Sequence, residues 1–183
     1  MRPFILLAAL AAAAPALAAL APGAVAPDFT TRGGLAGKAF QMRLATELKR
    51  GPVVLYFFPA AGTAGCNAEA KAFADAVPDF KAAGATVIGM SADTVDTLKA
   101  FSAKECAGRF PVASAGRRVI AAYDVDYGKP VATNGGPARQ ITKRTSYVIA
   151  PDGRIIFEHT GGDPMPHVAN TLKAVRDWRA AHG

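Results

Sequence analysis

A buried apolar strand that runs directly into a cysteine-bearing loop constrains this chain more than any other feature. Residues 53–58 read Val-Val-Leu-Tyr-Phe-Phe, a β-branched and aromatic run with the length of a buried strand. Pro59 ends the run, and the small-residue loop that follows contains Thr63 and Cys66. Residues 68–83 then carry apolar side chains at helical spacing, which places Cys66 at the start of a helix. Unpaired backbone N–H groups at a helix start favour a thiolate over a thiol, so the sequence predicts that Cys66 is a nucleophile.

Strand-like and helix-like patterns alternate along the rest of the chain. Strands are expected at residues 40–44, 86–91, 145–149 and 155–159, and helices at residues 94–106, 119–123 and 165–179. Pro151-Asp152-Gly153 predicts a hairpin turn between the last two strands. This order predicts one α/β domain with a thioredoxin-like fold, in which helices flank a central mixed β-sheet.

Three shorter segments lead to separate predictions. Residues 47–51 are interpreted as a turn. Pro78 is expected to kink or break the helix over residues 68–83, because proline lacks the N–H that a helix interior needs. Residues 126–140 contain several prolines and glycines, which predicts a long loop of the kind that often lines a site.

The first eighteen residues have the layout of a secretory signal peptide. Arg2 supplies a positive start, residues 4–14 form an uninterrupted apolar run, and Ala16-Leu17-Ala18 is a small-x-small cleavage pattern. We therefore interpret residues 1–18 as a cleaved signal and residues 19–183 as the folded domain.

An uncleaved membrane anchor is the competing interpretation, since no charged residue lies between Arg2 and Asp28. Pro15 and Pro22 interrupt the apolar stretch, which favours cleavage and a periplasmic or secreted protein without stable membrane association. In such an oxidising compartment the two cysteines can form one disulfide, either structural or catalytic.

The charge pattern excludes one class of function. The formal net charge is +7, but the basic residues are scattered and form no run of five or more, so we expect no nucleic-acid binding. The three histidines, His159, His167 and His182, do not form a close ligand set. We interpret them as solvated and expect no metal and no cofactor.

The cysteine loop resembles a known active site. Its spacing, Pro59-x-x-x-Thr63-x-x-Cys66, matches the motif of the peroxiredoxins of the AhpC/TSA superfamily residue for residue. Further matches follow in order at residues 22–29, 56–59, 110–114, 122–125 and 144–155. The chain is most similar to the bacterioferritin-comigratory, or peroxiredoxin Q, group, and the resemblance covers about residues 22–180. It implies a thiol-dependent peroxidase.

The resemblance also implies a role for each motif residue. Cys66 would attack one peroxide oxygen and become a sulfenic acid. Thr63 would hydrogen-bond near the sulfur and orient the peroxide, and Pro59 would shield the cysteine from water. Arg144 would supply a positive charge beside the thiolate, and Glu69 would be an arginine's partner rather than a proton carrier. The implied partners of this monomer or dimer are hydrogen peroxide or an organic hydroperoxide, and a thioredoxin-like or other dithiol reductant.

One position departs from the family pattern. Many members place a resolving cysteine five residues after the peroxidatic one, where this chain has Lys71. Cys106 is the only other thiol, so we expect it to resolve Cys66 through an intramolecular disulfide. Two alternatives stay open: a one-cysteine peroxidase resolved by an external thiol, and an exported thiol-disulfide oxidoreductase. The latter needs Cys-x-x-Cys, and position 69 is a glutamate.

Overall fold

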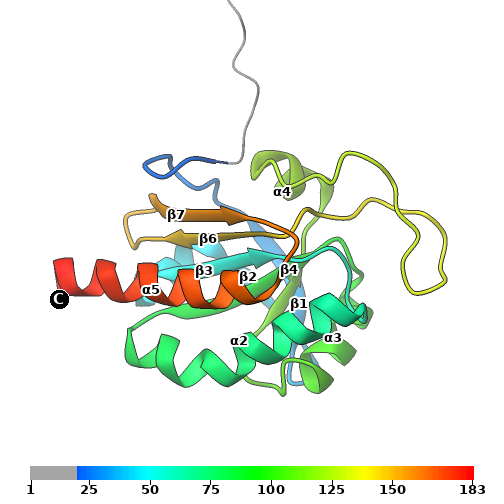
Figure 1. Cartoon of the computed structure of the whole chain (residues 1–183), viewed down its shortest axis with the longest axis horizontal. Helices are drawn as coiled ribbons and strands as arrows, with labels where there is room; N and C mark the ends of the chain where they lie inside the picture. The colour runs from blue at the N-terminus through cyan, green and yellow to red at the C-terminus, as the bar shows by residue number, and fades with distance from the viewer. Residues whose placement is uncertain (1–19) are drawn as a thin grey trace, which may run out of the picture.

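The computed structural model describes residues 20–183, which form a seven-stranded mixed β-sheet with helices on both faces (Figure 1). The strands lie in the order β2-β1-β5-β4-β3-β6-β7. The strands are β1 Thr30–Leu35, β2 Lys38–Arg43, β3 Val53–Phe57, β4 Thr86–Ser91, β5 Val112–Ser114, β6 Thr145–Ile149 and β7 Ile155–Thr160. The helices are α1 Leu44–Glu47, α2 Ala64–Ala82, α3 Val95–Lys104, α4 Arg117–Ala122 and α5 Met165–His182, with a 3₁₀ turn, η1, at Leu48–Arg50.

The central strand β3 is buried on both faces, as its continuous apolar run predicts. It pairs in parallel with β4 and antiparallel with β6, so the sheet is mixed. Val54, Tyr56 and Phe58 belong to one apolar cluster. The residues between them in the strand, with Val53 before them, belong to the other cluster. The predicted α/β class is confirmed, and β3 lies at the centre of both cores.

The helices form a layer on each side of this sheet. Apolar side chains of α2, α3 and α5 pack into one cluster, and those of α1 and α4 pack into the other. Figure 1 shows α4 on the opposite side of the sheet from α2 and α3. The hairpin between β6 and β7 is present as predicted, with antiparallel pairing from Thr145 opposite Thr160.

The strand β1 was not predicted, because its residues, Thr-Thr-Arg-Gly-Gly-Leu, include two glycines and do not alternate between apolar and polar. Gly34 lies directly beneath α3, and a Cβ atom there would be 2.5 Å from Cα of Lys99. The close approach of this helix explains why a strand here contains glycine, which is ordinarily unfavourable in strands.

Two other predictions about local structure were wrong. Residues 47–51 are not a simple turn, because α1 begins at Leu44 and continues into η1. Pro78 does not break the helix, and α2 runs without interruption from Ala64 to Ala82. A proline at position 78 deprives the carbonyl of Ala74 of its helical donor. Arg109 Nη1 donates to that carbonyl at 3.1 Å and replaces the missing bond.

The long loop predicted over residues 126–140 is confirmed. Residues 123–144, all of which the structure describes, contain only isolated bridges between α4 and β6. The predicted signal at residues 1–18 lies outside the described residues. Among residues 20–183, every helix is too short or too polar to cross a bilayer.

Candidate active site

Cys66 lies in the first turn of α2, where the strand-loop-helix pattern places it. Thr63 is the N-cap residue in extended conformation, and the N–H of Asn67 donates to its carbonyl at 2.9 Å. Cys66 is the third residue of the helix and is 1% exposed. Its sulfur is therefore desolvated, and the partial positive charge of the helix start is directed at it.

Arg144 reaches this sulfur from a segment seventy-eight residues later in the chain. Its Nη2 atom lies 3.7 Å from Cys66 Sγ. Gly65 leaves room for this approach, since a Cβ atom there would be 3.3 Å from the same nitrogen. The Arg144 side chain is 9% exposed, so solvent screens its charge only weakly at the sulfur.

The other two guanidinium nitrogens of Arg144 are also bonded. Nη1 donates to Oε2 of Glu69, which is 0% exposed and lies one helical turn after Cys66. Nε donates to the carbonyl of Gly162 at 3.2 Å. Burial raises the pKa of Glu69 from its ordinary value of 4.5 to about 8, and the charge of Arg144 opposes that rise. These contacts hold the guanidinium in one orientation beside the sulfur.

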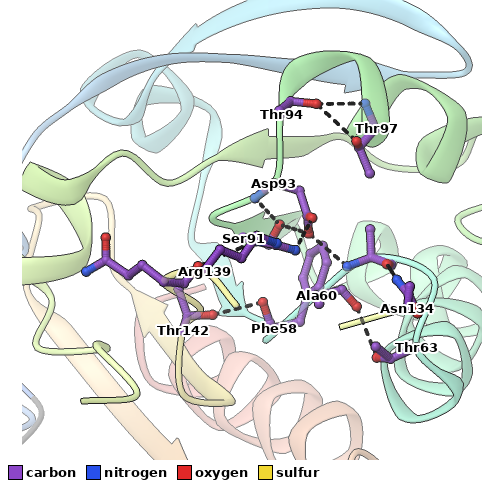
Figure 2. Close-up of polar contacts among 12 residues, drawn as sticks. Phe58, Ala60, Thr63, Ser91, Asp93, Thr94, Thr97, Asn134, Arg139 and Thr142 are labelled. Carbon is purple, nitrogen blue, oxygen red and sulfur yellow. Dashed lines mark hydrogen bonds and ion pairs between the residues drawn. The ribbon is translucent and has the colours of Figure 1, made fainter. Parts of the chain in front are cut away.

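Thr63 and Pro59 lie in the loop that leads to Cys66, as the motif requires. The Thr63 hydroxyl donates to the carbonyl of Ala60 at 3.0 Å, so it closes the loop ahead of the helix (Figure 2). Pro59 is partly buried and follows Phe58, the last residue paired with β4. The roles of these two residues toward a peroxide stay predictions.

A buried carboxylate holds the same loop from the other side. Asp93 Oδ2 accepts from the N–H of Ala61 at 2.8 Å and from the Ser91 hydroxyl at 2.7 Å (Figure 2). The N-cap of α3 is Thr94, whose hydroxyl accepts from the N–H of Thr97 at 3.3 Å. Asp93 is thereby left free to serve the loop.

The long loop over residues 126–140 closes over this arrangement. Arg139 Nη2 donates to Oδ1 of Asp93, and Asn134 Nδ2 donates to the carbonyl of Ala61 at 2.8 Å (Figure 2). Just beyond the loop, the Thr142 hydroxyl donates to the carbonyl of Phe58 at 2.8 Å. We call Asp93, Asn134 and Arg139 the clasp. Asp93 bonds the N–H of Ala61, Asn134 bonds its carbonyl, and Arg139 bonds Asp93.

Comparisons with known proteins agree with this geometry. A model of the AhpC/TSA family matches residues 22–158. The chain belongs to the AhpC/TSA family.

The relatives within this family are peroxiredoxins. A chloroplastic peroxiredoxin Q of Gentiana triflora is 34% identical over 158 residues, which cover 85% of this chain and 67% of that protein. The solved structure of peroxidoxin BcpB of Mycobacterium tuberculosis has a TM-score of 0.72 at 28% identity, covering 85% of this chain and 96% of that chain. Peroxiredoxin Q of Xanthomonas campestris has a TM-score of 0.67 at 27% identity, covering 81% and 90%.

These relatives indicate a thiol peroxidase, and the bacterioferritin-comigratory or peroxiredoxin Q resemblance is confirmed. The chain spans about two thirds of the length of the curated plant relatives it matches.

Cys106 has surroundings quite unlike those of Cys66. It lies two residues beyond the end of α3 and is 0% exposed, in the apolar cluster that also contains Cys66, Phe101 and Phe110. Both cysteines are free thiols. Burial raises the pKa of Cys106, and the neighbouring carboxylate of Glu105 raises it further.

The interpretation of His167 as a solvated residue was wrong. The imidazole is 0% exposed, with Nδ1 2.8 Å from Ser146 Oγ and Nε2 3.1 Å from the carbonyl of Gly161. Desolvation lowers the pKa of His167 from 6.5 to about 4. The spacing of His167, Thr171 and Val175 at four-residue intervals would have placed the histidine on the buried stripe of α5.

The clasp was missed altogether. Asp93 and Arg139 are 46 positions apart, and Asn134 is 73 positions from Ala61. The sequence shows the loop but gives no signal for these pairings.

Proposed function

We propose that the chain reduces hydrogen peroxide or an organic hydroperoxide through Cys66. The observation that carries this proposal is the 3.7 Å approach of Arg144 Nη2 to Cys66 Sγ at the start of α2. A thiolate there attacks one peroxide oxygen, the O–O bond breaks, and the other oxygen leaves as an alcohol or water after taking a proton. The guanidinium stabilises the negative charge as it moves from sulfur to the leaving oxygen.

The product at Cys66 is a sulfenic acid, which we propose is resolved by Cys106. The Cys106 sulfur displaces the hydroxyl group as water, and a Cys66–Cys106 disulfide forms. An external dithiol, thioredoxin-like or otherwise, then reduces that bond with two electrons. Two features support a step that needs local rearrangement: both sulfurs are buried, and the Cys106 thiol has a raised pKa in the closed fold.

The direct test is peroxide consumption by the purified protein with a dithiol reductant. Wild type should consume peroxide, and Cys66→Ser should lower the rate to the uncatalysed background. Full activity in Cys66→Ser would refute the proposal. Mass spectrometry after one equivalent of peroxide tests the second step. A loss of two hydrogens linking Cys66 to Cys106 supports internal resolution, whereas oxidised Cys66 with Cys106 free supports an external thiol.

We further propose that residues 1–18 direct export and are removed, which leaves the domain in the periplasm or outside the cell. The proposal depends on the charge and hydropathy pattern of these residues. N-terminal sequencing of the protein recovered from cell fractions tests it. An intact Met1 in the membrane fraction would favour an anchor instead.

A further inference from the structure

Among the described residues, the backbone atoms that hydrogen-bond to Arg144 belong to two adjacent glycines after β7, Gly161 and Gly162. Arg144 Nε donates to the carbonyl of Gly162 at 3.2 Å, and the N–H of Gly161 donates to the carbonyl of Arg144 at 3.2 Å. A pair of glycines has an unusually wide range of backbone conformations. The turn therefore needs an outside contact to present Gly162 in one orientation.

His167 makes that contact from the first turn of α5. Its Nε2 atom lies 3.1 Å from the carbonyl of Gly161, and a carbonyl can only accept, so Nε2 carries the proton. Nδ1 is then the acceptor for the Ser146 hydroxyl at 2.8 Å. The imidazole thus joins β6, which carries Ser146, to the glycine turn.

We propose that His167 is a positioning residue, which holds the Gly161–Gly162 turn so that Arg144 addresses the sulfur of Cys66. The proposal rests on the peroxidase function proposed above and deepens it. Three hydrogen bonds connect the imidazole to the sulfur. The imidazole bonds Gly161, the adjoining Gly162 accepts from Arg144 Nε, and Arg144 Nη2 contacts Cys66 Sγ. Each member is a hydrogen bond of the closed fold, and each is at least partly buried except the bond to Gly162.

Burial keeps the imidazole of His167 neutral, and the nearby charged groups modify this effect. The His159 ring on β7 lies edge-on with its centroid 4.6 Å away, and Arg144 adds positive charge, whereas Asp163 in the turn adds negative charge. Burial is the main cause that lowers the pKa of His167 to about 4, and His159 and Arg144 lower it further. The bond to the Gly161 carbonyl and the charge of Asp163 oppose this shift. The ring therefore keeps one N–H and one acceptor nitrogen across the neutral range, which the two bonds require.

Two substitutions separate positioning from packing. Glutamine can place its amide nitrogen where Nε2 lies and still donate to Gly161, whereas the shorter asparagine reaches only the position of Nδ1. We expect His167→Gln to react with hydrogen peroxide within about 3-fold of wild type, and His167→Asn to react about 10-fold more slowly. The measurement is the second-order rate constant of Cys66 oxidation in a single turnover. Equal rates in the two variants would overturn the proposal.

Two further variants distinguish the loss of positioning from a general loss of packing or folding. Thr171→Val is the matched control, since Thr171 is buried one turn along α5 and bonds only backbone carbonyls of His167 and Val168. It should leave the rate unchanged. If His167→Asn fails to fold, Ser146→Ala should slow the reaction about 3-fold, and an unchanged rate would count against positioning.

A readout without peroxide keeps this proposal separate from the proposed function. Nitrogen NMR of the imidazole should show Nε2 protonated and Nδ1 free at neutral pH, whatever the enzyme reduces. A protein with this tautomer but no Cys66-dependent peroxide consumption would refute the peroxidase function. An active protein with the proton on Nδ1 would refute the role of His167.

Discussion

The two cysteines share a core but have opposite environments. Cys66 is 1% exposed and Cys106 is 0% exposed, so access to solvent does not distinguish them. Cys66 has a helix start beneath it and a guanidinium 3.7 Å away, whereas Cys106 lies against apolar side chains, and burial raises its pKa. We therefore expect the reactivity of each thiol to depend on fixed positive charge at its sulfur rather than on its exposure.

The most direct way to break this comparison is to oxidise each thiol alone. In Cys106→Ser, one equivalent of hydrogen peroxide should consume the Cys66 thiol at least about 10³-fold faster than it consumes Cys106 in Cys66→Ser. Counting free thiols after denaturation at timed intervals gives both rates. Comparable rates would mean that Arg144 and the helix start do not activate Cys66.

Arg144→Gln tests the charge itself. It should lower the rate of Cys66 oxidation by about 10² to 10³, the effect of removing one group that stabilises developing negative charge. The single variant would leave the buried Glu69 without its bonding partner, so Arg144→Gln should be combined with Glu69→Gln. Arg154→Gln is the matched control, because Arg154 is exposed and pairs with Asp152. A double variant with the wild-type rate would show that the charge is irrelevant.

The buried imidazole of His167 should also make the free energy of unfolding depend on pH. The pKa of His167 is about 4 in the folded protein against 6.5 when unfolded, so the unfolded chain binds more protons between these values. The stability contributed by the neutral ring is full above pH 6.5 and is lost as the pH falls toward 4. Between pH 7.5 and 4.5, wild type should lose about 2–3 kcal/mol more than His167→Gln.

Urea unfolding of both proteins at the two pH values measures this difference, and other titrating groups cancel between them. An equal loss would mean that His167 is not desolvated in the folded state.

The same contrast explains how far the sequence could be interpreted. Apolar runs report burial directly, so β3 and the helix that begins near Cys66 were predicted from residue type and spacing. β1 was missed because its two glycines lie against distant neighbours that no local pattern shows: Gly33 against β5 and Gly34 against α3. The Pro78 prediction was wrong for a similar reason, since Arg109, thirty-one positions later, completes the bond that proline cannot make.

The site divides in the same way. Pro59, Thr63 and Cys66 lie within eight residues, and their motif together with Arg144 could be recognised from the sequence alone. The clasp and the bond between His167 and Ser146 join segments that are at least 21 positions apart in the chain, through single polar contacts whose residue types are common on surfaces. Such contacts become visible only when the backbone brings the segments together.

The smallest expected effect concerns the clasp, which bonds both backbone groups of Ala61 and which we expect to slow movement of the Cys66 loop toward Cys106. A disulfide needs Cα atoms within about 4.4–6.8 Å, and the two thiols are buried on separate segments, so we expect the loop to move before the bond forms. Asn134→Gly removes the 2.8 Å bond to Ala61 without backbone strain, because Asn134 already has a φ of 53°. The lost bond should favour the opened loop by about 1 kcal/mol, or roughly 5-fold.

Disulfide formation after a peroxide pulse should therefore be about 5-fold faster in Asn134→Gly, while the first step at Cys66 keeps its rate. Quenched-flow alkylation followed by mass spectrometry separates the two steps. Lys129→Ala is the control, because Lys129 is exposed in the same loop and makes no hydrogen bond within residues 20–183. A slower first step would mean that Asn134 serves peroxide attack instead. An unchanged second step would show that the clasp does not limit the meeting of the two thiols.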